Sequence, residues 1–270
     1  MADEAVKVWP RPYFKATEQQ TKIFFVCFAK GPLRELPLSR SRYGLPTSAC
    51  VDAIDVRLHQ RSETKAWFEG WFSGAFGVVA ARDLGDELPL LTDSDHCISL
   101  GLELPDQPDL APQQSMWALC RWLCERGAAV VLDVHAFVFR TRQDLEQLSF
   151  DGVDAARDVK LVLENEPTRD GLHLLHTRGL CKFARPELLC FVQPDDAALL
   201  ARAQQQIARA FIEGVSAPHA RLQVSEGVEL VTRPLDEPSL LRSLGLEAAV
   251  ELARADGSPL RGIGALVPAP

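Results

Sequence analysis

Asp133 and His135, near the middle of the chain, have the types and spacing of a small acid–base pair. They follow the apolar run Ala-Ala-Val-Val-Leu, so the stretch from Ala128 to Phe139 predicts a strand at the centre of a sheet. Side chains alternate along a strand, which would point both residues to one face. A carboxylate beside an imidazole can orient it for general-base chemistry. No nucleophile can be placed beside them, so a polar strand end is the simpler interpretation.

A second cluster, Asp93-Ser94-Asp95-His96, combines two carboxylates and an imidazole that could hold a divalent cation. The same residue types also satisfy the local backbone hydrogen bonds of a turn, and this is the simpler interpretation. Phosphate-binding loops, dinucleotide fingerprints and the H-E-x-x-H pattern are absent, and Gly70-Trp-Phe-Ser73-Gly74 has the wrong spacing for a nucleophile elbow. We therefore expect no cofactor and no metal.

The stretch from Leu172 to Leu188 gathers basic side chains in an otherwise acidic part of the chain. Gly179 would turn the backbone, Phe183 would anchor the loop in the core, and Pro186 would start the next strand. A supported loop of this kind can bind an anion or an acidic partner, although a solvated hairpin explains it as well. The candidate binding residues here are Arg178, Lys182 and Arg185, with His176 beside them.

The same run, His176-Thr-Arg-Gly-Leu-Cys-Lys-Phe-Ala-Arg-Pro-Glu-Leu188, resembles the C-terminal part of uncharacterised bacterial proteins grouped as domains of unknown function. The resemblance covers well under a tenth of the chain. It implies no activity, cofactor or partner.

An aromatic stripe follows Ser62, which offers an N-cap for a helix over residues 62–74. Trp67 and Trp71, like Phe68 and Phe72, are spaced i, i+4, so all four rings would cluster along one side. Such a stripe is usually core, because aromatic rings bury large areas. The alternative is a partner-binding face formed by Trp67 and Trp71.

The elements that would position these residues indicate an α+β fold. We expect two lobes, residues 1–150 and 151–270, each a mixed or antiparallel sheet with helices packed on one face. Expected strands are 22–28, 50–58, 97–104, 128–139, 160–164, 171–177, 187–193 and a pairing over 220–231 around Glu226-Gly227. Expected helices are 62–74, 113–126, 141–148 and 195–213, the last with Gln204 and Gln205 outward, then helical turns over 238–253. Residues 31–48 and 83–95 read as loop or turn, and the tail from Val267 as loose.

Composition limits the classes of partner. The chain has 270 residues, 47% of them hydrophobic, which supports a globular core. A net charge of −8 argues against binding to nucleic acid or an anionic membrane, although residues 1–45 are net basic and read as a solvated arm. Seven cysteines without a C-x-x-C spacing favour free thiols in a reducing, cytoplasmic compartment. The excess of Arg over Lys is typical of a GC-rich bacterial genome.

Two functional hypotheses remain. The first is a non-enzymatic interaction or regulatory protein, immunity-like or accessory, that binds another cytosolic protein. The second is an enzyme of unfamiliar class, with a polar cleft between the lobes lined by Asp133, His135, His176 and Arg178.

Overall fold

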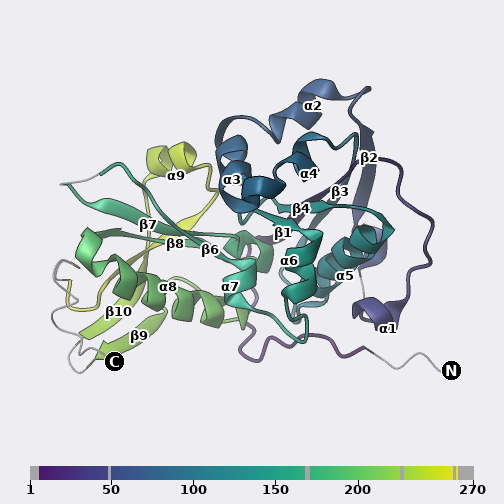
Figure 1. Cartoon of the computed structure of the whole chain (residues 1–270). Coiled ribbons are helices and arrows are strands. Elements are labelled where there is room, and N and C mark those ends of the chain that lie inside the picture. Colours follow the sequence, from purple (N-terminus) through teal and green to yellow (C-terminus); the bar gives the residue numbers. More distant parts are fainter. Residues whose placement is uncertain (1–5, 48–49, 168–170, 226–227, 258–259, 261–270) are drawn as a thin grey trace. The chain divides into compact units, whose positions relative to one another are not determined.

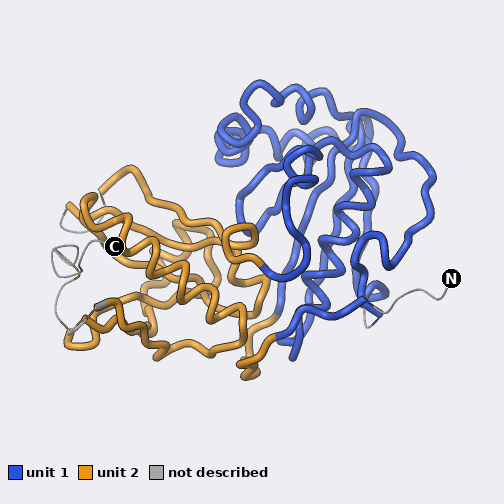
Figure 2. Tube along the Cα trace, turned by 60° about the horizontal axis from the view of Figure 1, so that its bottom comes forward, with its two compact units in different colours: residues 1–10, 21–153 blue, residues 11–20, 154–270 orange. Residues whose placement is uncertain are grey.

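The computed structural model describes residues 6–47, 50–167, 171–225, 228–257 and 260 (Figure 1). The expected turn at Glu226-Gly227 and the tail from Val267 lie outside these residues. The fold is α+β, as predicted. The chain forms two compact units: unit 1 contains residues 1–10 and 21–153, and unit 2 contains residues 11–20 and 154–270 (Figure 2). Residues 11–20, which we expected in the N-terminal lobe, thus pack in unit 2.

Unit 1 is built on a five-stranded sheet of order β2-β3-β1-β4-β5. The pairs β2/β3, β1/β4 and β4/β5 are antiparallel. Alternating side chains of β1 supply both layers of the core: Phe25 packs on Trp117 on one side, and Phe28 packs on Phe68 on the other. The strands are β1 (Gln20–Ala29), β2 (Asp55–Gln60), β3 (His96–Pro105), β4 (Val130–Asp133) and β5 (Val138–Thr141).

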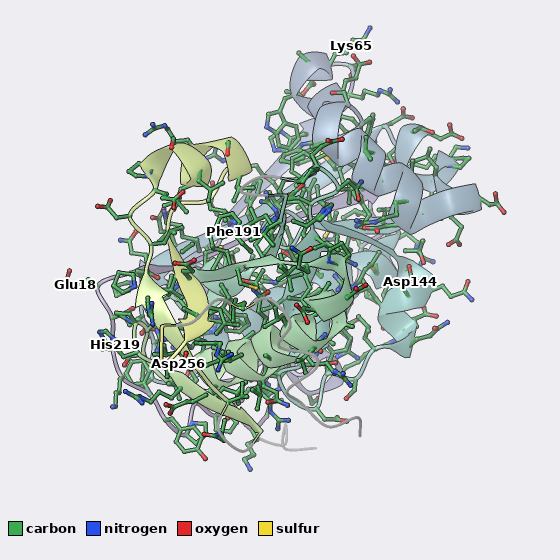
Figure 3. All side chains as sticks on the ribbon, turned by 90° about the vertical axis from the view of Figure 1, so that its left-hand side faces the viewer. Glu18, Lys65, Asp144, Phe191, His219 and Asp256 are labelled. Atoms are coloured by element: carbon green, nitrogen blue, oxygen red, sulfur yellow. The ribbon has the colours of Figure 1, made fainter. Side chains whose placement is uncertain are left out.

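Helices lie on both faces of this sheet, whereas we expected one covered face. One side receives α5, and the other receives α2 and α3. Thr141 and Asp144, the latter labelled in Figure 3, form a reciprocal capping box that starts α6. The helices are α1 (Arg40–Tyr43), α2 (Lys65–Gly70), α3 (Gly74–Leu84), α4 (Pro89–Thr92), α5 (Ala111–Arg126) and α6 (Arg142–Gln147), with 3-10 turns at Val51–Ala53 and Gly85–Glu87.

Several predictions of local structure in unit 1 are wrong. The loop expected over 31–48 contains α1, and the strand expected over 50–58 begins at Asp55, after a 3-10 turn. The strand expected over 128–139 is a hairpin, because β4 ends at Asp133 and a turn precedes β5. The helix expected over 62–74 ends at Gly70, and α3 follows from Gly74, which has a left-handed φ of 57°. Residues 83–95, expected as turns alone, include the end of α3 and all of α4.

Unit 2 is built on a six-stranded sheet of order β6-β7-β8-β11-β10-β9. It is mixed, because β8 and β11 are parallel while the other neighbouring strands are antiparallel. The helical turns expected over 238–253 are partly wrong: α9 ends at Leu244, Gly245 adopts a left-handed φ of 65°, and β11 follows. The strands are β6 (Lys160–Leu163), β7 (His173–Arg178), β8 (Glu187–Val192), β9 (Arg221–Ser225), β10 (Val228–Pro234) and β11 (Ala249–Arg254).

The two longer helices of unit 2 cover opposite faces of its sheet. Phe191, labelled in Figure 3, packs in the cluster that includes α9. The other face receives α8, whose Gln204 is fully buried and donates hydrogen bonds to the Leu175 carbonyl and to Cys190 Sγ. The expectation that Gln204 faces outward is therefore wrong, because its side-chain amide donates a hydrogen bond to a main-chain carbonyl in the core. The helices are α7 (Ala155–Asp158), α8 (Ala197–Ile212) and α9 (Pro238–Leu244), with 3-10 turns at Leu180–Phe183 and Pro194–Asp196.

Candidate functional site

Contrary to expectation, Asp133 and His135 do not lie on one strand. Asp133 is the last residue of β4 and is fully buried, and its Oδ1 accepts a hydrogen bond of 3.1 Å from the Ala136 amide. His135 lies in the turn that follows. The two side chains therefore do not share a strand face, and the Asp133 carboxylate stabilises the turn of the hairpin.

His176, the third catalytic candidate, belongs to unit 2, whereas Asp133 and His135 belong to unit 1. It is fully buried on β7, and its Nε2 lies 3.0 Å from Glu164 Oε1. Its Nδ1 lies 3.2 Å from the Thr177 carbonyl oxygen. Neither unit contains all three residues, so the structure offers no catalytic triad within a unit.

We expect His176 to make stability depend on pH. Burial lowers its pKa, and the hydrogen bonds to Glu164 and the Thr177 carbonyl offset part of this effect. The unfolded chain, with a histidine pKa of about 6.5, then takes up a proton at a higher pH than the folded chain. The free energy of unfolding should therefore fall as pH drops below about 6.5.

Urea denaturation at several pH values between 7 and 5 measures this slope. A His176→Gln variant should show a shallower dependence than the wild type, whatever its stability at pH 7. His173→Gln, which makes the same substitution at a half-buried histidine of the same strand, controls for the exchange of histidine by glutamine. Parallel curves for wild type and His176→Gln would contradict the assignment.

The basic loop is not an exposed surface, and this prediction is wrong. Lys182 and Arg185 are only 2% and 1% exposed, and Arg178 is partly buried and donates to the Leu244 carbonyl. Arg185 donates from Nη2 to the Lys15 and Gly214 carbonyls, both at 3.0 Å, and from Nε to the Val215 carbonyl at 2.9 Å. Arg178 and Arg185 therefore bind main-chain carbonyls of their own unit, and Lys182 is buried beside them in sequence.

Arg11 belongs to the same arrangement. It is 5% exposed, not part of a solvated arm, and donates to the Ile212 and Phe183 carbonyls, both at 3.1 Å. The final carbonyls of a helix lack partners within the helix and carry partial negative charge. Arg11 thus binds the last carbonyl of α8, and Arg185 binds the carbonyls of two residues just beyond the helix.

The buried carboxylate of Glu187 accepts hydrogen bonds from the first part of the segment from His176 to Leu188. Glu187 accepts hydrogen bonds from Thr177 Oγ1 at 2.7 Å, from the Gly179 amide at 2.8 Å and from the Leu180 amide at 2.9 Å. Burial raises the pKa of Glu187, and these donors act in the opposite direction. The run from His176 to Leu188 is therefore a polar network that shapes unit 2.

The two tryptophans of the aromatic stripe are partly buried against the sheet. Trp67 stacks on His59 at 3.9 Å between ring centroids, and Trp71 lies 5.5 Å from Trp67 and 6.3 Å from Phe24. Both belong to the core cluster that contains Phe68. Their contacts are those of core residues.

An apolar groove of about 450 Å³ lies in unit 1 between the edge of the sheet and α5. It satisfies the usual size range of a binding cavity and is lined largely by apolar side chains. Pro32 and Leu33, from the long loop after β1, also contribute to its wall. The strands and α5 contribute Val56, Leu58, Ile98, Leu100, Leu119 and Trp122.

The edge strand β2 makes this groove open. Among the described residues, β2 pairs with β3 alone, with Val56 opposite Leu100 and Leu58 opposite Ile98. Val56 is 57% exposed and Leu58 is 62% exposed, which is unusual for large apolar side chains on a sheet. Their exposure and their position at the edge leave an apolar face without a cover in the described part of unit 1.

Polar groups gather at one end of the groove, where Gln60, His96 and Arg126 belong to its lining. His96 Nδ1 is buried and has no hydrogen-bond partner among the described residues. The neighbouring Ser94 donates to the Leu90 carbonyl at 2.8 Å, as a turn residue does. In the described chain, no group of three or more His, Cys, Asp or Glu side chains could hold a metal.

The groove was not predicted from the sequence, although Val56 and Leu58 lie in the strand expected over 50–58. Their exposure depends on β2 being the edge strand and on how far α5 extends across the sheet, and neither is a local property.

The described helices include none with the length and apolar character needed to cross a membrane. All seven cysteines are free. No protein-family model matches this chain, and neither a curated protein nor a solved structure matches it.

Proposed function

We propose that this chain is a non-enzymatic, cytosolic bacterial protein that binds an extended segment of a partner protein along β2, in a regulatory or accessory role. The observation that carries the proposal is the open edge of β2, where Val56 and Leu58 lie exposed over the apolar groove. Monomeric proteins rarely leave such apolar surface uncovered without a use for it.

The backbone of β2 supports binding by strand addition. An edge strand presents unpaired amide and carbonyl groups, which proteins usually protect against pairing with another chain. An incoming strand can use these groups for affinity, while its alternate side chains enter pockets and give specificity. The groove beside Val56 and Leu58 supplies such a pocket.

The two faces of β2 indicate the sequence pattern of the partner. Val56 and Leu58 face the groove, whereas Asp55 and Arg57 form an exposed ion pair of 2.7 Å. Because strand side chains alternate, the bound segment should place apolar residues at every second position and polar residues between them. Polar groups of Gln60, His96 and Arg126 would meet one end of it.

The enzyme alternative has less support. The Asp133 carboxylate is used in a turn, and His176 is fully buried with hydrogen-bond partners on both ring nitrogens. A general base must reach the proton of a substrate, and burial of this kind opposes that.

A peptide library displayed on phage, screened with the full chain, tests the proposal. We expect enrichment of peptides with alternating apolar residues, and at least about tenfold weaker binding to a Val56→Ser/Leu58→Ser variant. Val78→Ser is the matched control, because Val78 on α3 is 73% exposed but does not line the groove. Enriched peptides that bind the double variant as well as the wild type would exclude this face.

Main-chain pairing has its own readout. Two versions of an enriched peptide can be N-methylated at every second amide, with the methylated positions offset by one residue between them. Only one version should lose binding, because only the amides that face β2 donate to it. If the wild type instead forms a dimer that the Val56→Ser/Leu58→Ser change dissociates, the occupant is a second copy of this chain and the partner-protein proposal is wrong.

A further inference from the structure

A second cavity of unit 1, about 540 Å³, is lined by charged side chains. Its walls come from the long loop after β1, from α1, α5 and α6, and from the segment after α6. It uses other residues of α5 than the groove does, namely Arg121, Cys124 and Glu125. Four arginines line it: Arg34, Arg42, Arg121 and Arg142.

Two of these arginines are paired with carboxylates. Arg42 Nη2 lies 2.6 Å from Glu125 Oε2, which also accepts a hydrogen bond from Tyr43. Arg142 Nε lies 2.8 Å from Glu146 Oε1. The carboxylates of Glu125 and Glu146 are therefore each in an ion pair with an arginine of the cavity wall.

The other two arginines bind neutral acceptors. Arg34 Nη2 donates to the Glu125 carbonyl at 2.7 Å, and Arg121 Nη1 donates to the Tyr43 carbonyl at 3.1 Å. Glu35, on the exposed loop, is the third carboxylate of the lining, so the cavity keeps one more arginine than glutamate. This leaves positive charge next to a space that can hold a ligand.

Arg121 is the least exposed of the four arginines. Its guanidinium stacks over the Phe150 ring at 4.8 Å, and burial lowers its pKa, which shows the cost of desolvating the cation. A guanidinium has five N–H donors in a planar fork, suited to two oxygens of one anion. The charges of Glu125 and Asp151 act in the opposite direction, and an oxyanion at this position would add a charged hydrogen-bond partner to this cation.

We propose that this cavity binds a small organic oxyanion, a carboxylate or a phosphate monoester with an apolar body. Arg121 and Arg34 would hold the oxyanion, and Leu145, Leu148 and Phe150 supply apolar wall for the body. The volume lies within the range of small-molecule sites. This ligand site is independent of the groove and goes beyond the proposed binding of a partner segment.

Calorimetric titration of the full chain with phenyl phosphate and with benzoate tests the site, with benzyl alcohol as the uncharged analogue. We expect at least one anion to bind below about 1 mM and benzyl alcohol not to bind in that range. Arg121→Gln should weaken binding at least about tenfold. The tighter anion identifies whether the natural ligand carries a carboxylate or a phosphate.

Arg34→Gln provides a second variant, because Arg34 is exposed and its replacement leaves the packing of α5 in place. It should weaken binding several-fold. The matched control is Arg202→Gln, on the exposed side of α8 in unit 2, which should bind as the wild type does. The proposal is overturned if neither anion binds at about 10 mM, or if Arg121→Gln and Arg34→Gln both retain wild-type affinity.

Discussion

Replacing Arg185 with methionine should lower the free energy of unfolding by more than about 3 kcal/mol, because several buried acceptors would lose their donor together. The side chain is 1% exposed and donates to the carbonyls of Lys15, Ala184, Gly214 and Val215. Methionine fills much of the volume but donates no hydrogen bond. The carbonyls would then remain buried without this partner.

Urea denaturation monitored by circular dichroism measures the loss. Arg202→Met is the matched control, since Arg202 is exposed on α8 and its change should stay within about 0.5 kcal/mol. Arg185→Lys should give an intermediate loss, because an ammonium keeps the charge but cannot span carbonyls that a planar fork reaches. A loss below about 1 kcal/mol for Arg185→Met would show that these hydrogen bonds contribute little.

Gly214→Ala should release residues 11–20 from unit 2 and cost more than about 2 kcal/mol, since overpacking combines here with backbone strain. Gly214 has a φ of 108°, and an added Cβ would lie 2.5 Å from Phe14 Cα and 2.6 Å from Phe14 N. Main-chain hydrogen bonds fix this approach, from the Tyr13 amide to the Glu213 carbonyl and from the Lys15 amide to the Gly214 carbonyl. The segment must move for the methyl group to fit.

Gly245→Ala separates strain from overlap. Gly245 also has a left-handed φ, of 65°, but a Cβ there meets no atom within 4 Å. It should cost only about 1 kcal/mol, the penalty for a side chain in that conformation. Trypsin should cleave at Lys15 faster in Gly214→Ala than in Gly245→Ala, and equal stability and cleavage in both would refute the steric argument.

Elements with a strong local pattern were predictable. The apolar run of β1 was sufficient to predict a strand, and the amphipathic pattern of α5 was sufficient to predict a helix. Helix α3 was not predicted, and its sequence contains Gly74 and Gly77, which have low helix propensity. In the fold, a Cβ at Gly77 would lie 2.6 Å from the Phe72 carbonyl oxygen, so glycine is required by close packing that no local pattern reveals.

The charges of unit 2 were misread for a related reason. Arg185 was expected to be an exposed cation of a loop, yet it donates to main-chain carbonyls of residues 15, 214 and 215, two of them distant in sequence from one another. Every residue has a main-chain carbonyl, so the residue types in a sequence do not show which carbonyls will accept a hydrogen bond from an arginine. The groove of unit 1 was equally hidden, because strand order decides which strand is at the edge.

Unit 2 is encoded in two separated stretches of the gene, and this shapes how the protein can be made and dissected. Residues 11–20 emerge from the ribosome before residues 21–153 of unit 1, but the carbonyls to which they donate belong to residues 183–214. Unit 2 therefore cannot mature until most of the chain has been translated, whereas residues 21–153 are available earlier. Expression of residues 154–270 alone would omit Arg11 and the Lys15 carbonyl, so a cassette for unit 2 needs residues 11–20 grafted back onto it.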